Sequence, residues 1–279
     1  MHHPTVHKLF LFSFALVLGS YSTTWALSPS KTYTTLPHDH HLKYEALTIP
    51  TTDGASLQAW YFPAQSGDKI IVMSHDGVEN MGAYLARIKL FVKYGFHVMA
   101  YDYRGYGHSS SFVINPLQYV YPEFFTDFDA IIDFVSENYQ QDIIAYGWGI
   151  GAGISITRGY RRPEIQGIVA DAPFLDLKRL PHRFEEIHAV MTVPKALFAL
   201  DYNTLHSVSQ PAQPKLRGIL YLHGPGNYLF QKSDLLELYQ KTLYDRKELY
   251  VFEKSGHMDN FTANESEYAR QLYMFVINL

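Results

Sequence analysis

The residues best suited to chemistry in this sequence surround a glycine-rich segment at positions 147–151. A β-branched pair at 143–144 leads into Gly-Trp-Gly-Ile-Gly, and the small residues of 152–160 then predict a helix. A strand, a tight turn and a helix are the setting of the G-x-S-x-G motif, whose strained turn exposes a nucleophilic serine. Here the serine position is Gly149, which has no side chain to attack a carbonyl. The pattern therefore predicts the turn without its nucleophile.

Strands and helices that could position this turn alternate along the chain from about residue 44. Predicted strands cover 45–49, 56–62, 70–74, 96–101, 143–146, 167–170, 218–223 and 248–252, and predicted helices cover 82–94, 122–138, 152–160 and 264–278. Asp53-Gly54 predicts a hairpin turn between the first two strands. The alternation indicates an α/β fold with a mostly parallel central sheet and helices on both faces. The irregular, proline-interrupted segment 176–214 predicts a short cap.

Length and composition limit the classes of protein that fit. A chain of 279 residues without cysteine suits one α/β domain, expected at 43–279, that needs no disulfide support. The formal net charge of −4 argues against a nucleic-acid partner, which would require clustered Lys and Arg.

The amino-terminal residues 1–26 have the plan of a secretory signal peptide. Lys8 supplies positive charge, 9–19 is an apolar run, and Thr-Trp-Ala at 24–26 resembles a cleavage site. The alternative is an uncleaved membrane anchor, although the run is shorter than the ~20 apolar residues of a spanning helix. We expect a secreted or periplasmic protein with no stable membrane span after cleavage. The polar residues 27–42 are expected to form a linker.

Two further patterns have competing interpretations. His38-Asp39-His40-His41 could bind a metal, but no partner ligands follow at a defining spacing, so a solvated segment is favoured. The residues 147–152 also match G-x-G-x-x-A, a dinucleotide fingerprint, which belongs in the first strand–helix turn of a domain and here follows several strands. We therefore expect neither a metal site nor a cofactor.

Taken together, these motifs resemble the α/β-hydrolase superfamily, and within it the BEM46-like and serine-aminopeptidase-like group. The likeness covers about 44–279, and Tyr-Asp-Tyr-Arg-Gly-Tyr-Gly-His-Ser at 101–109 is its most specific part. The other motifs are Thr-Asp-Gly at 52–54, His-x-Gly-x-x-Asn-Met-Gly at 75–82, the turn at 147–151, Asp-Ala-Pro-Phe at 171–174, His-Gly-x-x-Asn at 223–227 and Ser-Gly-His at 255–257. The resemblance implies an α/β-hydrolase fold and hydrolysis of esters, thioesters or amides by a Ser, an Asp and a His in that order.

Carried onto this sequence, the family's catalytic triad is degenerate. The nucleophile position is Gly149, the acid position is Asn227, and His257 keeps its expected identity. The family's His-Gly after the third strand is His75-Asp76 here, and an inward-pointing Asp76 carboxylate would oppose a developing oxyanion. The implied oxyanion donors are the backbone amides of Gly77 and Ile150.

Other nucleophiles are less well placed by the sequence. Ser74 and Ser109 lie on neighbouring loops and Ser155 lies within the helix after the turn, where packing or turn roles are expected. Our leading interpretation is a non-catalytic protein that binds a small-molecule or peptide ligand in the vestigial pocket, or a protein partner. The alternative is an active hydrolase of a small ester, thioester or amide that uses a non-standard nucleophile or an activated water.

Overall fold

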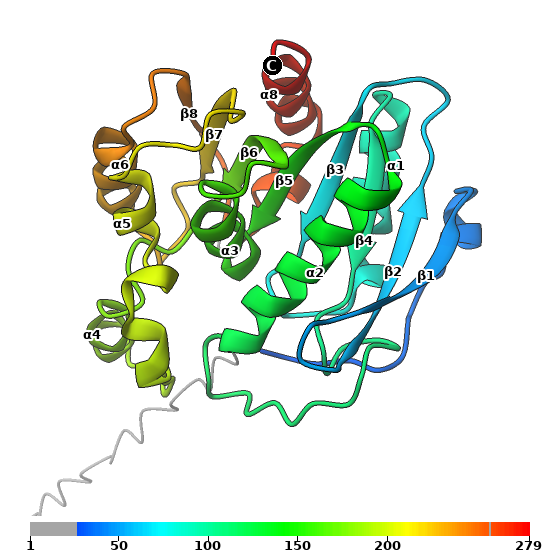
Figure 1. Ribbon diagram of the computed structural model, residues 1–279. Coiled ribbons are helices and arrows are strands. Elements are labelled where there is room, and N and C mark those ends of the chain that lie inside the picture. The colour runs from blue at the N-terminus through cyan, green and yellow to red at the C-terminus, as the bar shows by residue number, and fades with distance from the viewer. Residues whose placement is uncertain (1–26, 257) are drawn as a thin grey trace, which may run out of the picture.

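The computed structural model describes residues 27–256 and 258–279, so the predicted signal segment and His257 lie outside the described residues. In this part of the chain, an eight-stranded sheet has the order β1-β2-β4-β3-β5-β6-β7-β8 (Figure 1). Its strands are β1 Glu45–Pro50, β2 Ser56–Phe62, β3 Lys69–Ser74, β4 His97–Tyr101, β5 Asp142–Trp148, β6 Ile165–Asp171, β7 Gly218–His223 and β8 Lys247–Val251. The α/β-hydrolase fold is thus confirmed.

Only β2 interrupts the parallel arrangement of the described sheet. It pairs antiparallel with both β1 and β4, as the predicted hairpin at Asp53-Gly54 requires. The strands from β4 to β8 pair in parallel. Because the carboxyl ends of parallel strands meet at one edge, the loops after β3, β4, β5, β6 and β7 gather there. This edge is where the candidate site must lie.

Helices cover both faces of the sheet. The α-helices are α1 Leu85–Lys93, α2 Pro122–Asn138, α3 Ile150–Gly159, α4 Leu180–Glu186, α5 Thr204–Val208, α6 Lys232–Lys241, α7 Asn260–Ala263 and α8 Glu265–Ile277, and the 3-10 helices are η1 Pro37–His40, η2 Met81–Tyr84, η3 Lys195–Phe198 and η4 Leu200–Tyr202. Figure 1 shows α2 and α3 in front of the sheet, with α1 and α8 behind it. The helix predicted at 82–94 begins as the 3-10 helix η2.

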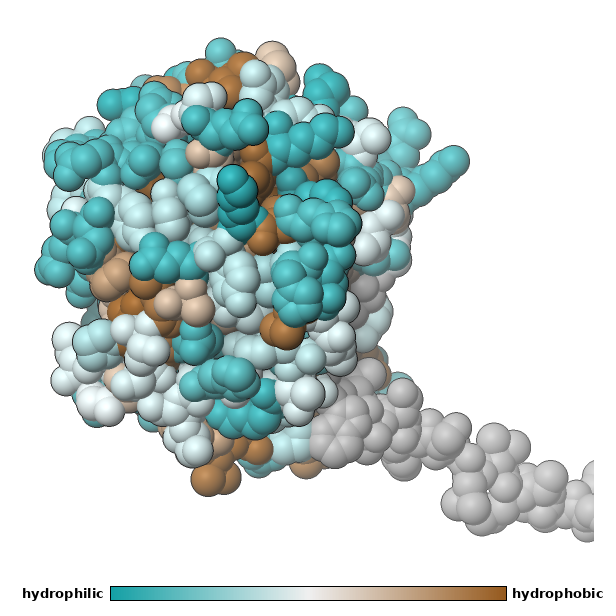
Figure 2. All heavy atoms as spheres, turned by 90° about the vertical axis from the view of Figure 1, so that its right-hand side faces the viewer, coloured by the Kyte–Doolittle hydropathy of each residue, from teal (hydrophilic) through white to brown (hydrophobic). Residues whose placement is uncertain are grey.

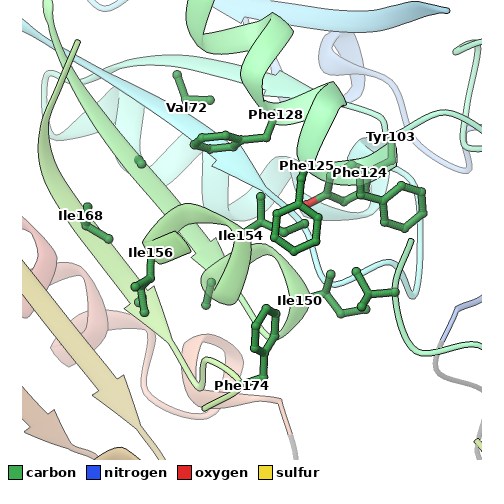
Figure 3. Close-up of a cluster of buried hydrophobic side chains, with 14 of the residues drawn as sticks. Val72, Tyr103, Phe124, Phe125, Phe128, Ile150, Ile154, Ile156, Ile168 and Phe174 are labelled. Atoms are coloured by element: carbon green, nitrogen blue, oxygen red, sulfur yellow. The ribbon is translucent and has the colours of Figure 1, made fainter. Parts of the chain in front are cut away.

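Two clusters of buried apolar side chains correspond to these two faces. One cluster joins the sheet to α2 and α3, and Figure 3 shows Phe128 beside Val72 of β3 and Phe124 beside Tyr103. The other joins the sheet to α1 and α8 through side chains such as Phe91 and Leu272. Strands buried on both faces explain why β3, β4 and β7 read as continuous apolar runs.

Residues 27–42, expected to be a linker, pack against the domain. Leu27 is fully buried, and the Tyr33 hydroxyl donates to Asp102 Oδ2 at 2.5 Å. Thr35 Oγ1 donates to the Gly82 carbonyl at 2.8 Å. The composition of this segment does not predict these contacts. They are made mainly by main-chain and hydroxyl groups, which form hydrogen bonds with water equally well. We call residues 27–33 the strap.

The segment between β6 and β7 forms the short cap that the prolines predicted. It contains α4, η3, η4 and α5, and it touches the loop before α2 through a bridge between Gln118 and Thr192. Because this segment follows β6, it extends from the carboxyl edge of the sheet. The cap therefore lies beside the candidate site.

The surface of the described residues is mainly polar on the face drawn in Figure 2, with apolar side chains in small separate groups. None of the helices in the described part of the chain is both long and apolar enough to cross a membrane. Across the same residues, no three His, Asp or Glu side chains are arranged to hold a metal ion. His38 instead lies 3.2 Å from Asp39 in an exposed pair.

Candidate functional site

The turn between β5 and α3 keeps the strained geometry of a nucleophile elbow. Gly149 has φ 55° and ψ −117°, a conformation that L side chains rarely adopt, and its amide donates to the Asp171 carbonyl at 2.9 Å. A Cβ at Gly151 would overlap the Ser74 carbonyl of β3, so close packing of the helix on the strand requires glycine there. The backbone is thus that of an elbow whose apex has no side chain.

Met258 fills the space above this apex. A Cβ placed on Gly149 would lie 2.5 Å from Met258 Cε and 3.3 Å from Asp76 Cβ. Met258 itself has φ 62°, an uncommon conformation for a methionine. No pattern in the sequence marked this residue, because the contact depends on how the loop after β8 folds over the elbow.

Asp76 lies beside the elbow with its carboxylate held by its own loop. Its Oδ1 accepts hydrogen bonds from the Tyr84 hydroxyl at 2.8 Å and from the Val78 amide at 3.2 Å. Burial raises the pKa of Asp76, and the bond from Tyr84 partly offsets that effect. The structure thus gives the orientation that the sequence left open: the carboxylate is directed at Tyr84 and the following turn.

Gly77, the first candidate oxyanion donor, uses its amide within its own turn. The Gly77 N–H donates to His75 Nδ1 at 3.1 Å, and the Gly77 carbonyl accepts from the Tyr106 hydroxyl at 2.6 Å and from the Ser28 amide at 2.9 Å. Burial lowers the pKa of His75 to about 3, so its ring stays neutral and keeps an acceptor nitrogen at neutral pH. This amide is therefore not free to bind an oxyanion.

The second candidate donor, Ile150, is the first residue of α3 and is buried. The first amides of an α-helix have no partner within the helix, so this position keeps a group able to bind an anion. A Cβ on Gly77 would lie 3.7 Å from Ile150 Cδ1, so the side chain of Ile150 lies beside the Gly77 turn.

Asn227 is brought to the same site by the loop after β7. Its Oδ1 accepts from the amides of Leu229 and Phe230 at 3.1 and 3.0 Å, and its Nδ2 lies 3.6 Å from Met258 Sδ. The side-chain carbonyl thus shapes its own loop while the amide group faces the methionine above the elbow. His257 lies outside the described residues, so its predicted role stays a prediction.

A buried polar network supports the elbow from below and was missed at the sequence level. Arg87 donates to the Tyr146 hydroxyl at 2.8 Å, and Tyr146 and Tyr268 share a hydrogen bond of 2.9 Å. Tyr268 and Asn260 then donate to the two oxygens of Asp171 at 3.0 and 2.6 Å. Burial raises the pKa of Asp171 to about 6. The network joins α1, β5, α7 and α8 to the residue whose carbonyl holds Gly149.

The serines considered as substitute nucleophiles are buried. Ser74 shares a hydrogen bond of 2.9 Å with the Tyr101 hydroxyl, and Ser109 Oγ donates to the Asp102 carbonyl at 2.7 Å. Ser155 is fully buried within α3. These environments fit the structural roles expected for them.

Open space remains beside the cap. A cavity of about 340 Å³ lies between α4 and the start of α6, with Leu180, Leu229 and Phe230 among its apolar lining residues. Arg179 and Arg183 also line it, and Arg179 forms a bidentate pair with Glu237 at 2.8 and 3.1 Å. Since Leu229 and Phe230 are held by Asn227, this cavity adjoins the candidate site.

Comparison with known proteins agrees with this geometry. The family model described as serine aminopeptidase, S33, matches residues 65–218, which include the elbow. The chain belongs to this family. The matched region ends at the start of β7, so it includes neither Asn227 nor His257.

Curated relatives cover most of the chain at low identity. An uncharacterized membrane protein of Saccharomyces cerevisiae, YNL320W, is 21% identical over 85% of this chain and 81% of its own length. The α/β hydrolase domain-containing protein WAV2 of Arabidopsis thaliana is 22% identical over 88% and 83%. Among solved structures, the Pyrococcus furiosus esterase Pf2001 has a TM-score of 0.75 at 22% identity, covering 91% of this chain and 98% of the esterase. This last similarity shows the fold alone.

Proposed function

We propose that this family member has lost covalent serine hydrolysis and acts as a ligand-binding or protein-interaction module. The observation that carries the proposal is the apex of the elbow, where Gly149 provides no hydroxyl and Met258 Cε takes the adjoining space. Acyl transfer through a covalent intermediate requires a nucleophile at hydrogen-bond reach of a base. The described residues offer none at this point.

Two further features support a binding role over catalysis. The Gly77 amide donates to His75, so one implied oxyanion donor is already used. Stabilisation of an oxyanion is usually a large part of the rate enhancement in acyl transfer, and one missing donor costs about 10²–10³ in turnover. The cavity beside the cap, with its apolar floor and paired charges, is suited to a small organic ligand or a peptide side chain.

The test is labelling of the purified full chain with a fluorophosphonate probe, which reacts with activated serines. We expect no labelling above that of heat-unfolded protein, and mass spectrometry should find no modified serine. Stoichiometric labelling at any serine would instead support the alternative of an active hydrolase, and the modified residue would identify its nucleophile.

The proposed place of action is outside the cytoplasm, because residues 1–26 have the plan of a signal peptide. Expression in the native host followed by cell fractionation tests this. We expect the protein in the secreted or periplasmic fraction with Leu27 as its first residue. A protein that remains with the membrane fraction and begins at Met1 would indicate a retained anchor.

A further inference from the structure

The strap begins in an apolar seat next to the candidate oxyanion donors. The Leu27 side chain has no exposed surface, and its Cδ2 lies 2.5 Å from the position that a Cβ on Gly77 would take. The same position is 3.2 Å from the Tyr106 hydroxyl and 3.7 Å from Ile150 Cδ1. The seat thus includes a glycine at φ 80°, with the Tyr106 hydroxyl and an aliphatic side chain of the elbow helix close to it.

The rest of the strap is held mainly through its backbone. The Ser28 amide donates to the Gly77 carbonyl, and the Ser30 carbonyl accepts from the Gly107 amide, both at 2.9 Å. Asn80 Nδ2 donates to the carbonyls of Ser30 and Thr32 at 3.2 and 2.8 Å. Main-chain bonds combined with one side-chain pocket are a recurring way of binding extended peptides, because the backbone bonds accept any sequence and the pocket selects one side chain.

We propose that the groove between the loops after β3 and β4 is a binding site for an extended peptide that places an aliphatic side chain in the seat, and that the strap occupies it as an internal ligand. The groove lies at the carboxyl edge of the sheet, which is the ligand crevice of open α/β folds. This inference rests on the proposed binding role and names the ligand class for it. A tethered segment has a high effective concentration, so a free peptide competes only when the strap is weakened.

The test uses fluorescence anisotropy with a labelled synthetic peptide of the sequence Leu-Ser-Pro-Ser-Lys-Thr-Tyr-Thr-Thr, which copies residues 27–35. In the full chain, Leu27→Ala empties the seat, and we expect it to bind the peptide at least about tenfold more tightly than the unaltered chain. Lys31→Ala is the matched control, because it removes a strap contact outside the seat, from Lys31 Nζ to the Ser109 carbonyl at 2.9 Å, and leaves Leu27 in place. It should bind the peptide less tightly than Leu27→Ala does.

Two changes locate the peptide in the groove. A peptide whose first residue is aspartate should bind the Leu27→Ala chain about tenfold more weakly or worse, because burying a carboxylate costs far more free energy than burying an aliphatic side chain. Adding Asn80→Asp keeps the side-chain oxygen that accepts from the Gly82 amide but removes the donor to the peptide backbone. We expect this change to weaken peptide binding by about tenfold.

A folded Leu27→Ala chain that binds neither peptide, or binds both equally, overturns the inference. If Leu27→Ala does not fold, the milder Leu27→Val takes its place with the same two peptides. The outcome is separable from that of the proposed function. A chain that binds the peptide but is labelled by the fluorophosphonate probe contradicts only the proposed loss of catalysis. A chain that is not labelled and does not bind the peptide contradicts only the proposed peptide site.

Discussion

The elbow at Gly149 and the turn at Gly77 are the two backbone devices of the site, and they differ in how each departs from a working hydrolase. The elbow keeps its strained backbone, with φ 55°, and has no side chain at its apex. The Gly77 turn keeps its backbone and its amide, but the N–H is directed at His75 Nδ1. One region lacks a chemical group, and the other has a group already in use.

This difference shows that geometry and chemistry are maintained by separate residues. The elbow is held by glycines at its crowded contacts and by the buried network from Arg87 to Asp171 below it. The Gly77 turn is held by Tyr106 and by the strap. Packing therefore maintains the backbone conformation of each region, whether or not the region takes part in catalysis. The following predictions test the two regions separately.

The largest effect is expected below the elbow. Arg87→Met removes the cation whose charge favours the ionised form of Asp171 and leaves this buried carboxylate with the neutral donors Asn260 and Tyr268. Breaking a buried charge network in this way typically costs about 3–5 kcal/mol of unfolding free energy. Urea unfolding followed by tryptophan fluorescence measures it.

Arg270→Met is the matched control, because Arg270 pairs with Glu267 on the surface of α8. It should leave the unfolding midpoint unchanged. If the two variants behave alike, the buried network contributes nothing special to the elbow's support.

The next effect is a pH dependence of the unfolding free energy that we expect from Asp102. Burial raises the pKa of Asp102 to about 7, well above its ordinary value of 3.8. A carboxyl whose folded pKa is raised favours the folded state when protonated. Its contribution is therefore full below about pH 4 and is lost as the pH rises through 7. Between these pH values, the stability of Asp102→Asn relative to that of the unaltered chain should rise by up to about 4 kcal/mol.

The measurement compares urea midpoints of the two proteins from pH 4.5 to 8. His75, whose pKa is lowered to about 3, has the opposite pH dependence, and its Nε2 lies 4.0 Å from Asp102 Oδ1, so the difference between the two proteins reports Asp102 together with its effect on His75. A difference that does not change with pH would mean that Asp102 titrates normally despite its burial.

A smaller effect is expected from restoring a side chain to the elbow. Gly149→Ser places a Cβ at φ 55° and 2.5 Å from Met258 Cε, which should cost about 1–2 kcal/mol of stability. Combined with Met258→Ala, the contact is relieved, so the cost in the double variant should be less than the sum of the single changes. Urea unfolding of the four proteins gives this cycle.

Esterase activity of the same variants provides a second measurement. The Gly77 amide still donates to His75 in these variants. Neither Gly149→Ser nor Gly149→Ser with Met258→Ala should therefore hydrolyse a small ester such as p-nitrophenyl acetate faster than Gly149→Ala. The alanine variant has the same backbone strain but no hydroxyl. Rapid turnover specific to the serine variants would show that the oxyanion side is more complete than its hydrogen bonds indicate.

The smallest effect is expected at the Gly77 carbonyl. Tyr106→Phe removes one of the two hydrogen bonds to this oxygen and leaves the one from Ser28. Because the acceptor stays paired, the loss should be about 1 kcal/mol. Thermal unfolding by circular dichroism measures it, with Tyr44→Phe on the exposed amino-terminal side as control. A loss as large as that of Arg87→Met would indicate that the strap is displaced as well.

The sheet and its main helices could be predicted because their signals are local. The apolar run of β7 and the stripe of α2 were placed at 218–223 and 122–138, where the structure has them. The packing of residues 27–42 could not be predicted, since a polar segment makes the same local pattern whether its hydrogen bonds go to water or to Asn80 and Gly107. Met258 and the Arg87 network were missed for a similar reason: their partners are distant in sequence.

By itself, the sequence determined that the apex of the elbow has no hydroxyl, because the identity of a residue at a backbone-defined turn is a covalent fact. It also determined the α/β layers, because apolar periodicity is local. Only the tertiary structure decided that Met258 covers Gly149, that the Gly77 amide is directed at His75 and that Leu27 fills the seat beside them. Each of these depends on distances between separate loops at the carboxyl edge, and those distances are set by the packing of the whole sheet.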